Sequence, residues 1–194
     1  VARGRMLGGT SSLNGMMAVR GHPADYDGWR DMGLPGWGFD DVLPYFRKLE
    51  NHWRGETPLH GGAGPVSVQP HPSPSRLYPL AQQAAVSLGY NLTNDFNGER
   101  TDGFGMPDFT ITRRGRRAST AQAYLDPARR RPNLTVMTNA PVHRILIEDG
   151  RACGVLFCVG DQERIARANA EVLLCGGAIN SPQLLMLSGI GPAA

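Results

Sequence analysis

Residues 171–191 read EVLLCGGAINSPQLLMLSGIG, an apolar run followed by two glycines and a longer helical segment. The run 171–175 is apolar after its first residue, as in a strand buried in a parallel sheet. After the glycines we expect a helix with Ser181 as its N-cap, Pro182 at its first position and Gly189 as its stop. This strand–glycine–helix unit predicts an α/β fold with a helix N-terminus facing the crevice at the end of the strand. Such units are common, so this one does not identify a function.

A second glycine-rich stretch lies near the start of the chain, where residues 4–17 read GRMLGGTSSLNGMM. The adjacent Gly8 and Gly9 expose backbone N–H groups, and the hydroxyls of Thr10 and Ser11 add further donors. A loop of this kind can cradle a phosphate or the polar edge of a planar ring. The same composition also suits a tight turn or a helix cap, and the residues alone leave both interpretations open.

Helical and strand-like segments fill the rest of the chain. Apolar residues on one face, acidic residues in the first turn and basic residues in the last predict a helix over 40–50. Further helices are expected over 75–88 and 118–125, and the second should end before Pro127. Strands are expected over 65–69, 108–112, 134–138, 142–148 and 154–159. The last two strands should be joined by a turn at Asp149-Gly150. The pattern indicates an α/β protein with α+β character in its middle part.

The composition excludes several classes of protein. The chain has 194 residues, of which 41% are hydrophobic and 19% charged, as in ordinary globular proteins. It lacks the run of about 18 apolar residues that a membrane span requires, so we expect no membrane span. The net charge is +3, and almost all of the positive charge is arginine, seven of which form two local clusters at 113–117 and 129–131. A phosphate or nucleic-acid patch is one interpretation of them, but solvated loops are favoured and we expect no nucleic-acid partner.

The three cysteines and the first residue of the chain indicate the cellular compartment and the position of the true N-terminus. Cys153, Cys158 and Cys175 have no framework spacing, which favours reduced thiols in a cytoplasmic protein. The histidines are scattered, so we expect no metal site. No signal peptide is visible, and the absence of an initiator Met suggests that the true N-terminus lies upstream.

The order of the motifs resembles one known family. Residues 4–15, followed by RGHPADYD at 20–27, resemble the first signature of the glucose–methanol–choline (GMC) oxidoreductases, and residues 177–192 (GAINSPQLLMLSGIGP) resemble the second. The landmarks between them, in family order, are GW at 36–37, VLPYF at 42–46, HGG at 60–62, DFNG at 95–98 and AYL at 123–125. The resemblance covers the whole chain and is closest to the choline dehydrogenase-like branch.

The resemblance implies a domain organisation. Members of the family combine a Rossmann-like FAD domain with a substrate domain built on an antiparallel sheet. Residues 1–35 and 134–194 would belong to the FAD domain, and residues 36–133 to the substrate domain and the lid over the flavin.

The resemblance also implies cofactor-binding residues. The pyrophosphate and flavin of FAD would lie along the loop formed by Gly8, Gly9, Thr10 and Ser11. The isoalloxazine ring would lie along Asn14, Gly15, Met16 and Met17. Val142 would meet the adenine through its backbone, and Gly177 and Ala178 would lie close to the dinucleotide. Some members attach FAD through a histidine directly before the signature Asn; here that position is Leu13, so non-covalent FAD is expected.

The implied reaction is oxidation of a small alcohol at its CH–OH group, with hydride transfer to flavin N5. The dinucleotide fingerprint Gly-x-Gly-x-x-Gly and the C-terminal catalytic His of the family are both absent from the 194 residues. We therefore expect an internal fragment that contains no catalytic residue and is inactive alone. A degenerate GMC homologue, a phosphate- or nucleic-acid-binding module and another Rossmann protein remain alternatives. The substrate and the electron acceptor are left undetermined.

Overall fold

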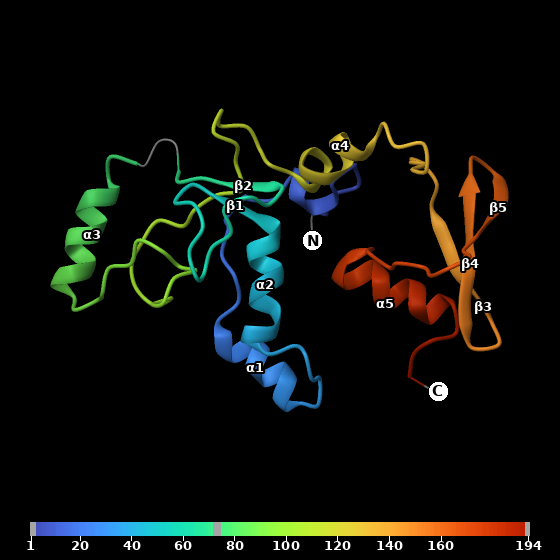
Figure 1. Ribbon diagram of the computed structural model, residues 1–194, viewed down its shortest axis with the longest axis horizontal. Coiled ribbons are helices and arrows are strands. Elements are labelled where there is room, and N and C mark those ends of the chain that lie inside the picture. The colour runs from blue at the N-terminus through green and yellow to red at the C-terminus, as the bar shows by residue number, and fades with distance from the viewer. Residues whose placement is uncertain (1–2, 72–74, 193–194) are drawn as a thin grey trace. The chain divides into compact units, whose positions relative to one another are not determined.

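The computed structural model describes residues 3–71 and 75–192 (Figure 1). The chain divides into two compact units, Val1–Arg131 and Pro132–Ala194, and each is described by itself. The first contains helices and a parallel strand pair, and the second an antiparallel sheet with one helix. The expected mixed α/β class is confirmed.

Two helices at the start of the first unit pack against each other through aromatic side chains. Helix α1 (Pro23–Asp31) begins after His22, whose ring accepts a hydrogen bond from the Ala24 amide while the Asp25 carboxylate accepts one from the His22 amide. This reciprocal cap, with proline at the first helical position, explains a helix that the sequence analysis did not predict. The buried ring of Tyr26 contacts Phe46 of α2 (Phe39–Leu49), the helix expected over 40–50.

A short parallel strand pair follows α2 directly. Strand β1 (Glu50–His52) pairs with β2 (Val66–Val68), and the side chains at both ends of each strand are buried. The expected strand over 65–69 is confirmed as β2, whereas β1 was not foreseen because its sequence, Glu-Asn-His, is polar. This strand pair therefore brings Glu50 and His52 into the interior of the unit.

The remaining elements of the first unit are helical. Helix α3 (Tyr78–Ser87) is followed by Gly89, whose φ of 84° supports the expected glycine stop. Residues 108–112 form isolated bridges and no named strand. The helix expected over 118–125 is the π-helical turn η2 (Ala121–Leu125), which continues into α4 (Asp126–Ala128). The prediction that it ends before Pro127 is wrong, because this proline occupies the first turn of α4, where its missing N–H is tolerated.

The second unit is a three-stranded antiparallel meander covered by a helix. Strands β3 (Val142–Glu148), β4 (Arg151–Val159) and β5 (Gln162–Arg167) lie in that order, and helix α5 (Gly177–Leu187) packs against β3. The Asp149-Gly150 turn is confirmed, with φ of 51° and 75° at the two residues. Ser188 joins helix to sheet, since its hydroxyl accepts from the Ile145 amide and donates to the Leu184 carbonyl.

Three predictions for this unit are wrong. Residues 134–138 and 171–175 form no strand, because an isolated apolar segment needs a neighbour to complete its ladder and no described residue pairs with either. Leu173 is consequently 76% exposed. Helix α5 begins at Gly177, so Ser181 does not cap it and Pro182 lies inside it.

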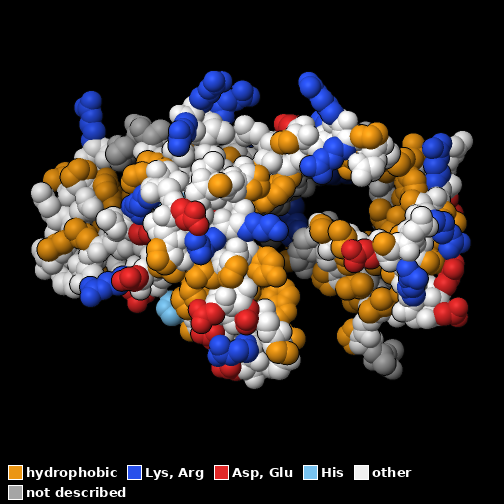
Figure 2. Space-filling model, in the orientation of Figure 1, with side chains coloured by type: hydrophobic (Ala, Val, Ile, Leu, Met, Phe, Trp, Pro, Cys, Tyr) orange, Lys and Arg blue, Asp and Glu red, His pale blue; other side chains and the backbone are white. Residues whose placement is uncertain are grey.

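Large apolar side chains are exposed on both units. Figure 2 shows them over α3, where Leu77, Leu80 and Leu88 lie on or beside the helix and are more than half exposed. Contiguous exposed apolar surface usually marks a region that contacts another protein segment. None of the helices in residues 3–71 and 75–192 has the length and apolar character required to cross a membrane.

Candidate functional site

The glycine-rich loop near the start of the chain is a tightly turned segment held by its own side chains. Gly8 and Gly9 have φ of 87° and 52°, a left-handed conformation that favours glycine, and η1 (Gly9–Ser12) follows. The Ser11 hydroxyl donates to the Gly8 carbonyl and the Ser12 hydroxyl to the Leu7 carbonyl. Both hydroxyls therefore fix the shape of the loop.

The loop presents an open face at two of its glycines. A Cβ built on Gly9 or on Gly15 would meet no protein atom within 4 Å, whereas one on Gly8 would lie 2.4 Å from the Ser12 hydroxyl. Thr10 and Asn14 are exposed beside this face. The backbone at Gly9 and Gly15 is therefore open to close approach, and the ligand cradle expected from the motif stays a prediction.

A segment about 100 residues further along the chain braces the loop. The Arg117 guanidinium donates to the carbonyls of Ser11 and Asn14, and the Thr120 hydroxyl lies 3.1 Å from that of Ser11 and 3.2 Å from the Gly8 carbonyl. The Thr120 amide also donates to the Ser11 hydroxyl. This role of Arg117 was not foreseen, because in the sequence Arg117 belongs to a cluster of arginines that is typical of a solvated loop.

Residues 16–20 lead the chain from the loop into the interior of the unit. Met16 has φ of 62°, and its carbonyl accepts from the Thr110 amide at 2.7 Å. Met17 is 64% exposed. Beyond it, the side-chain amide of Asn97 donates to the Ala18 carbonyl and accepts from the Arg20 amide. A mainly apolar cavity of 240 Å³ lies beside this segment, lined by residues that include Met17, Val19, Tyr26, Phe46, Val66 and Thr110.

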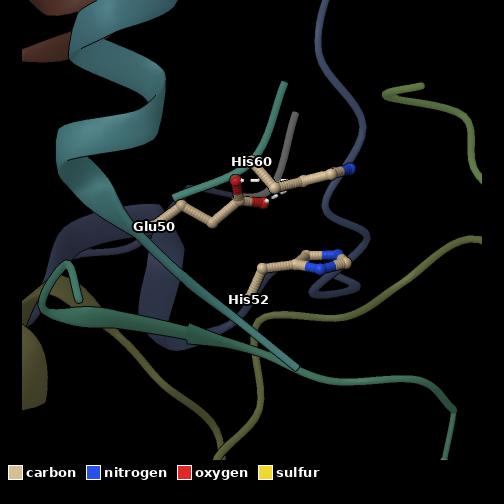
Figure 3. Close-up of side chains that lie close together, drawn as sticks. All are labelled: Glu50, His52 and His60. Carbon is tan, nitrogen blue, oxygen red and sulfur yellow. Dashed lines mark hydrogen bonds and ion pairs between the residues drawn. The ribbon is translucent and has the colours of Figure 1, made fainter. Parts of the chain in front are cut away.

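A buried network of charged side chains lies at the start of β1 (Figure 3). His60 is 2% exposed, and its ring places Nδ1 3.2 Å from the Glu50 carboxylate and Nε2 2.9 Å from the Asp95 carboxylate. Arg20 pairs with Glu50 at 2.6 Å, and Arg54 pairs with Asp95 at 3.3 Å. The network therefore alternates positive and negative groups from four separate segments of the chain.

The two carboxylates make His60 a cation. Burial opposes its charged form, but the hydrogen bonds to Asp95 and Glu50 outweigh this cost and raise the pKa of His60 to about 9. Burial likewise raises the pKa of both carboxyls, but bonds to His60 and the neighbouring arginines bring the net pKa of each below its ordinary value. With both ring nitrogens donating, His60 is poorly suited to act as a base at neutral pH.

The ring of His52 packs against this network through the ring of His60. Its ring stacks on that of His60 with centroids 3.9 Å apart, its Nδ1 accepts from the Arg54 amide and its Nε2 lies 2.9 Å from Asp108. Ligand atoms of Glu50, His52 and His60 lie within 4.8 Å of one another, as in a metal site. Each of these atoms has a protein partner, so the cluster is explained as a structural charge network. The absence of a metal site stays a prediction.

The second unit contains the other expected cofactor residues. Val142 lines a cavity of 520 Å³ together with Ile145 and Leu184, at the edge where Gly176 leads into α5. Gly177 has φ of 84°, and both it and Ala178 are exposed at the start of the helix. Val142 therefore lines the cavity, whereas Gly177 and Ala178 lie exposed directly after Gly176, and their contact with a dinucleotide stays a prediction.

Comparison with protein families gives a single assignment. The model of the GMC oxidoreductase family, in its N-terminal domain, matches residues 1–194. Among curated proteins, the oxygen-dependent choline dehydrogenases of Pseudomonas savastanoi pv. phaseolicola and Stenotrophomonas maltophilia are 52% and 50% identical to the chain. Each alignment covers 98% of this chain and 34% of the relative, so the chain spans about a third of the length of these relatives.

Solved structures have the same fold. Pyridoxine 4-oxidase from Mesorbium loti matches with a TM-score of 0.90 and 36% identity, over 98% of this chain and 38% of that one. An FAD-dependent oxidoreductase from Chaetomium thermophilum matches with a TM-score of 0.92 and 27% identity, over 99% and 36%. A formate oxidase variant from Aspergillus oryzae matches with a TM-score of 0.83 and 32% identity, over 98% and 34%.

Proposed function

The chain belongs to the GMC oxidoreductase family, and from this premise we propose that it builds part of the FAD site of an enzyme that oxidises the CH–OH group of a small alcohol. The observation that carries the proposal is the glycine-rich loop, whose open face at Gly9 and Gly15 lies within the family's first signature. When bound, FAD supplies a hydride acceptor, and the residues of this chain bind and orient it.

The residues of the first unit fit the cofactor. The pyrophosphate and flavin would lie along Gly8, Gly9, Thr10 and Ser11, since the left-handed turn at Gly8 leaves the backbone of Gly9 open to a ligand. Asn14 and Gly15 would lie along the isoalloxazine ring with Met16 and Met17. Fixed backbone and amide donors beside the ring can stabilise negative charge without reorganising.

The residues of the second unit fit the adenine half. Val142 would contact the adenine at the mouth of the 520 Å³ cavity. Gly177 and Ala178 would leave room for the dinucleotide at the start of α5, where unpaired backbone amides favour a phosphate. On this proposal residues 1–35 and 134–194 belong to the FAD domain, and residues 36–133 to the substrate domain and lid.

The cofactor would be held without a covalent bond. Leu13 occupies the position directly before Asn14, and a leucine offers no nucleophilic nitrogen. Acid precipitation of the full-length protein should leave all the flavin in the supernatant. Yellow colour in the washed pellet would show covalent attachment and contradict this part of the proposal.

Residues 1–194 alone should not turn over alcohols. The support is that the chain spans 34% of the choline dehydrogenases it matches, and that its buried His60 is held as a cation by two carboxylates, which suits it poorly to act as a base. Alcohol-dependent dye reduction by this chain alone would overturn the proposal. Choline is the first substrate to test with the full-length protein, since it appears in the names of the curated relatives.

A pair of glycine variants tests the FAD site itself. Gly15→Leu fills the open face without displacing protein atoms at Cβ, and Gly28→Leu makes the same change on α1, where a Cβ also meets nothing within 4 Å. We expect Gly15→Leu to weaken FAD binding at least tenfold with unchanged thermal unfolding of the apoprotein, and Gly28→Leu to bind FAD normally. Equal FAD affinity in both variants would refute the placement of the flavin at this loop.

A further inference from the structure

Arg117 differs from the other arginines of its cluster. Its Nη1 donates to the Ser11 carbonyl at 3.2 Å, to the Asn14 carbonyl at 2.8 Å and to the Asn14 side-chain Oδ1 at 2.9 Å. The side chain of neighbouring Arg116 is exposed and makes no hydrogen bond or ion pair with any described residue. A single guanidinium therefore holds two residues of the glycine-rich loop across more than 100 positions of sequence.

The backbone on both sides of this contact is fixed. Arg117 forms an antiparallel bridge with Ile111, and the Ala118 amide donates to the Thr110 carbonyl. The Thr110 amide in turn donates to the Met16 carbonyl. The guanidinium and the loop it contacts are thus anchored to the same short turn, which limits their relative motion.

The contacts determine the orientation of the Asn14 amide. Its Oδ1 accepts from the Met16 amide at 3.1 Å as well as from Arg117, so two donors face the oxygen and only this assignment of oxygen and nitrogen satisfies both. The Nδ2 group has no partner among the described residues. Because a hydrogen bond from a charged donor is stronger than a neutral one, Arg117 holds the oxygen inward and leaves two N–H donors turned outward.

We propose that Arg117 is a positioning residue of the flavin site, which acts through Asn14 by keeping the amide N–H donors turned toward the bound cofactor. This inference rests on the proposed function, in which Asn14 lies along the isoalloxazine ring. Donors fixed at the ring edge favour the negative charge that the ring gains with a hydride. Without Arg117 the Asn14 amide would be held less firmly, since the remaining donor to its oxygen, the Met16 amide, is neutral and weaker.

The test compares three variants of the full-length flavoprotein. Arg117→Met removes the guanidinium at similar length, and Arg116→Met is the matched control with the same change of net charge one residue away. The readouts are the reduction potential of the bound flavin, the FAD dissociation constant, and kcat and KM for the alcohol. Asn14→Leu removes the amide that Arg117 contacts. It therefore tests the effect of the amide donors on the flavin even if Arg117→Met fails to fold.

We expect Arg117→Met and Asn14→Leu each to favour the oxidised flavin about tenfold, which is a potential lower by about 30 mV for a two-electron couple. The kcat should fall at least tenfold with KM little changed, because the donors act on developing charge. Arg116→Met should match the wild type. If FAD still binds, and Arg117→Met and Asn14→Leu both have the same reduction potential and kcat as Arg116→Met, the inference is overturned. A wild-type protein that binds no FAD would instead refute the proposed function.

Discussion

Replacing His60 with glutamine should lower the free energy of unfolding by about 3 kcal/mol at pH 6 and by much less at pH 10. The histidine donates to Glu50 and Asp95 from its two ring nitrogens and is 2% exposed. Glutamine has no charge, and its amide cannot reproduce the two opposed donors of the ring. Arg20 and Arg54 remain beside the carboxylates in the variant and limit the loss.

The magnitude follows from the raised pKa of the histidine. His60 has an ordinary pKa of 6.5 and a pKa of about 9 in the folded protein, and a tenfold change in proton affinity is equivalent to about 1.4 kcal/mol of stability. Because the folded pKa is the higher one, this stabilisation is fully present below pH 6.5 and is lost as the pH rises through 9. A loss of about 3 kcal/mol also agrees with the typical cost of removing one partner from a buried ion pair.

The assay is urea unfolding of the full-length protein at half-unit intervals from pH 6 to pH 10, with His143→Gln as control. His143 is exposed on β3 and forms no ion pair with a described residue, so its replacement should change stability by less than about 0.5 kcal/mol. The difference between wild type and His60→Gln should shrink steadily above pH 6.5. A difference that is constant with pH, or that grows toward pH 10, would refute the assignment of His60 as a buried cation.

Three further substitutions test the geometry of the two units. Gly8→Ala forces a side chain into a φ of 87° and within 3.2 Å of Ala121, and should cost about 1–3 kcal/mol in urea unfolding with weaker FAD binding. Gly61→Ala places a Cβ against the backbone of the last turn of α2 and should lower the yield of folded protein, as size-exclusion chromatography would show. Ser188→Ala leaves the buried Ile145 amide without its acceptor and should cost about 1–3 kcal/mol, with faster hydrogen exchange at that amide; unchanged exchange would contradict the role given to the hydroxyl.

Local sequence signals predicted the elements whose cause is local. The helix α2 follows from its apolar face and charged ends, and the turn between β3 and β4 follows from the Asp149-Gly150 dipeptide. The glycine-rich loop was predicted from its composition, and its open face at Gly9 and Gly15 agrees with the expected close approach of a ligand.

Features that depend on distant partners could not be predicted in this way. The strands expected over 134–138 and 171–175 have the right composition, but no described residue completes their ladders. Arg117 and Ser11 are separated by more than 100 residues, so no local pattern reveals their contact. The polar sequence of β1 also gave no indication of a buried strand, because the charge of Glu50 is compensated by side chains from other segments of the chain.

The assignment of cofactor roles rests on the family signatures together with this geometry. Gly8, Gly9, Thr10 and Ser11 lie in one braced loop, and their role as a cofactor cradle stays a prediction. The roles of Val142, Gly177 and Ala178 stay predictions that the accessible backbone near α5 supports. Arg117 is bound to the loop, which weakens the alternative of a nucleic-acid patch built on its cluster.

The visible absorption spectrum of the purified full-length protein shows whether this chain forms part of an FAD site for alcohol oxidation. The spectrum is recorded before and after anaerobic addition of a panel of alcohols that includes choline. We expect a flavin band that one alcohol of the panel bleaches. Absence of a flavin band, even after reconstitution with FAD, would contradict the account and leave the glycine-rich loop as a scaffold without redox chemistry.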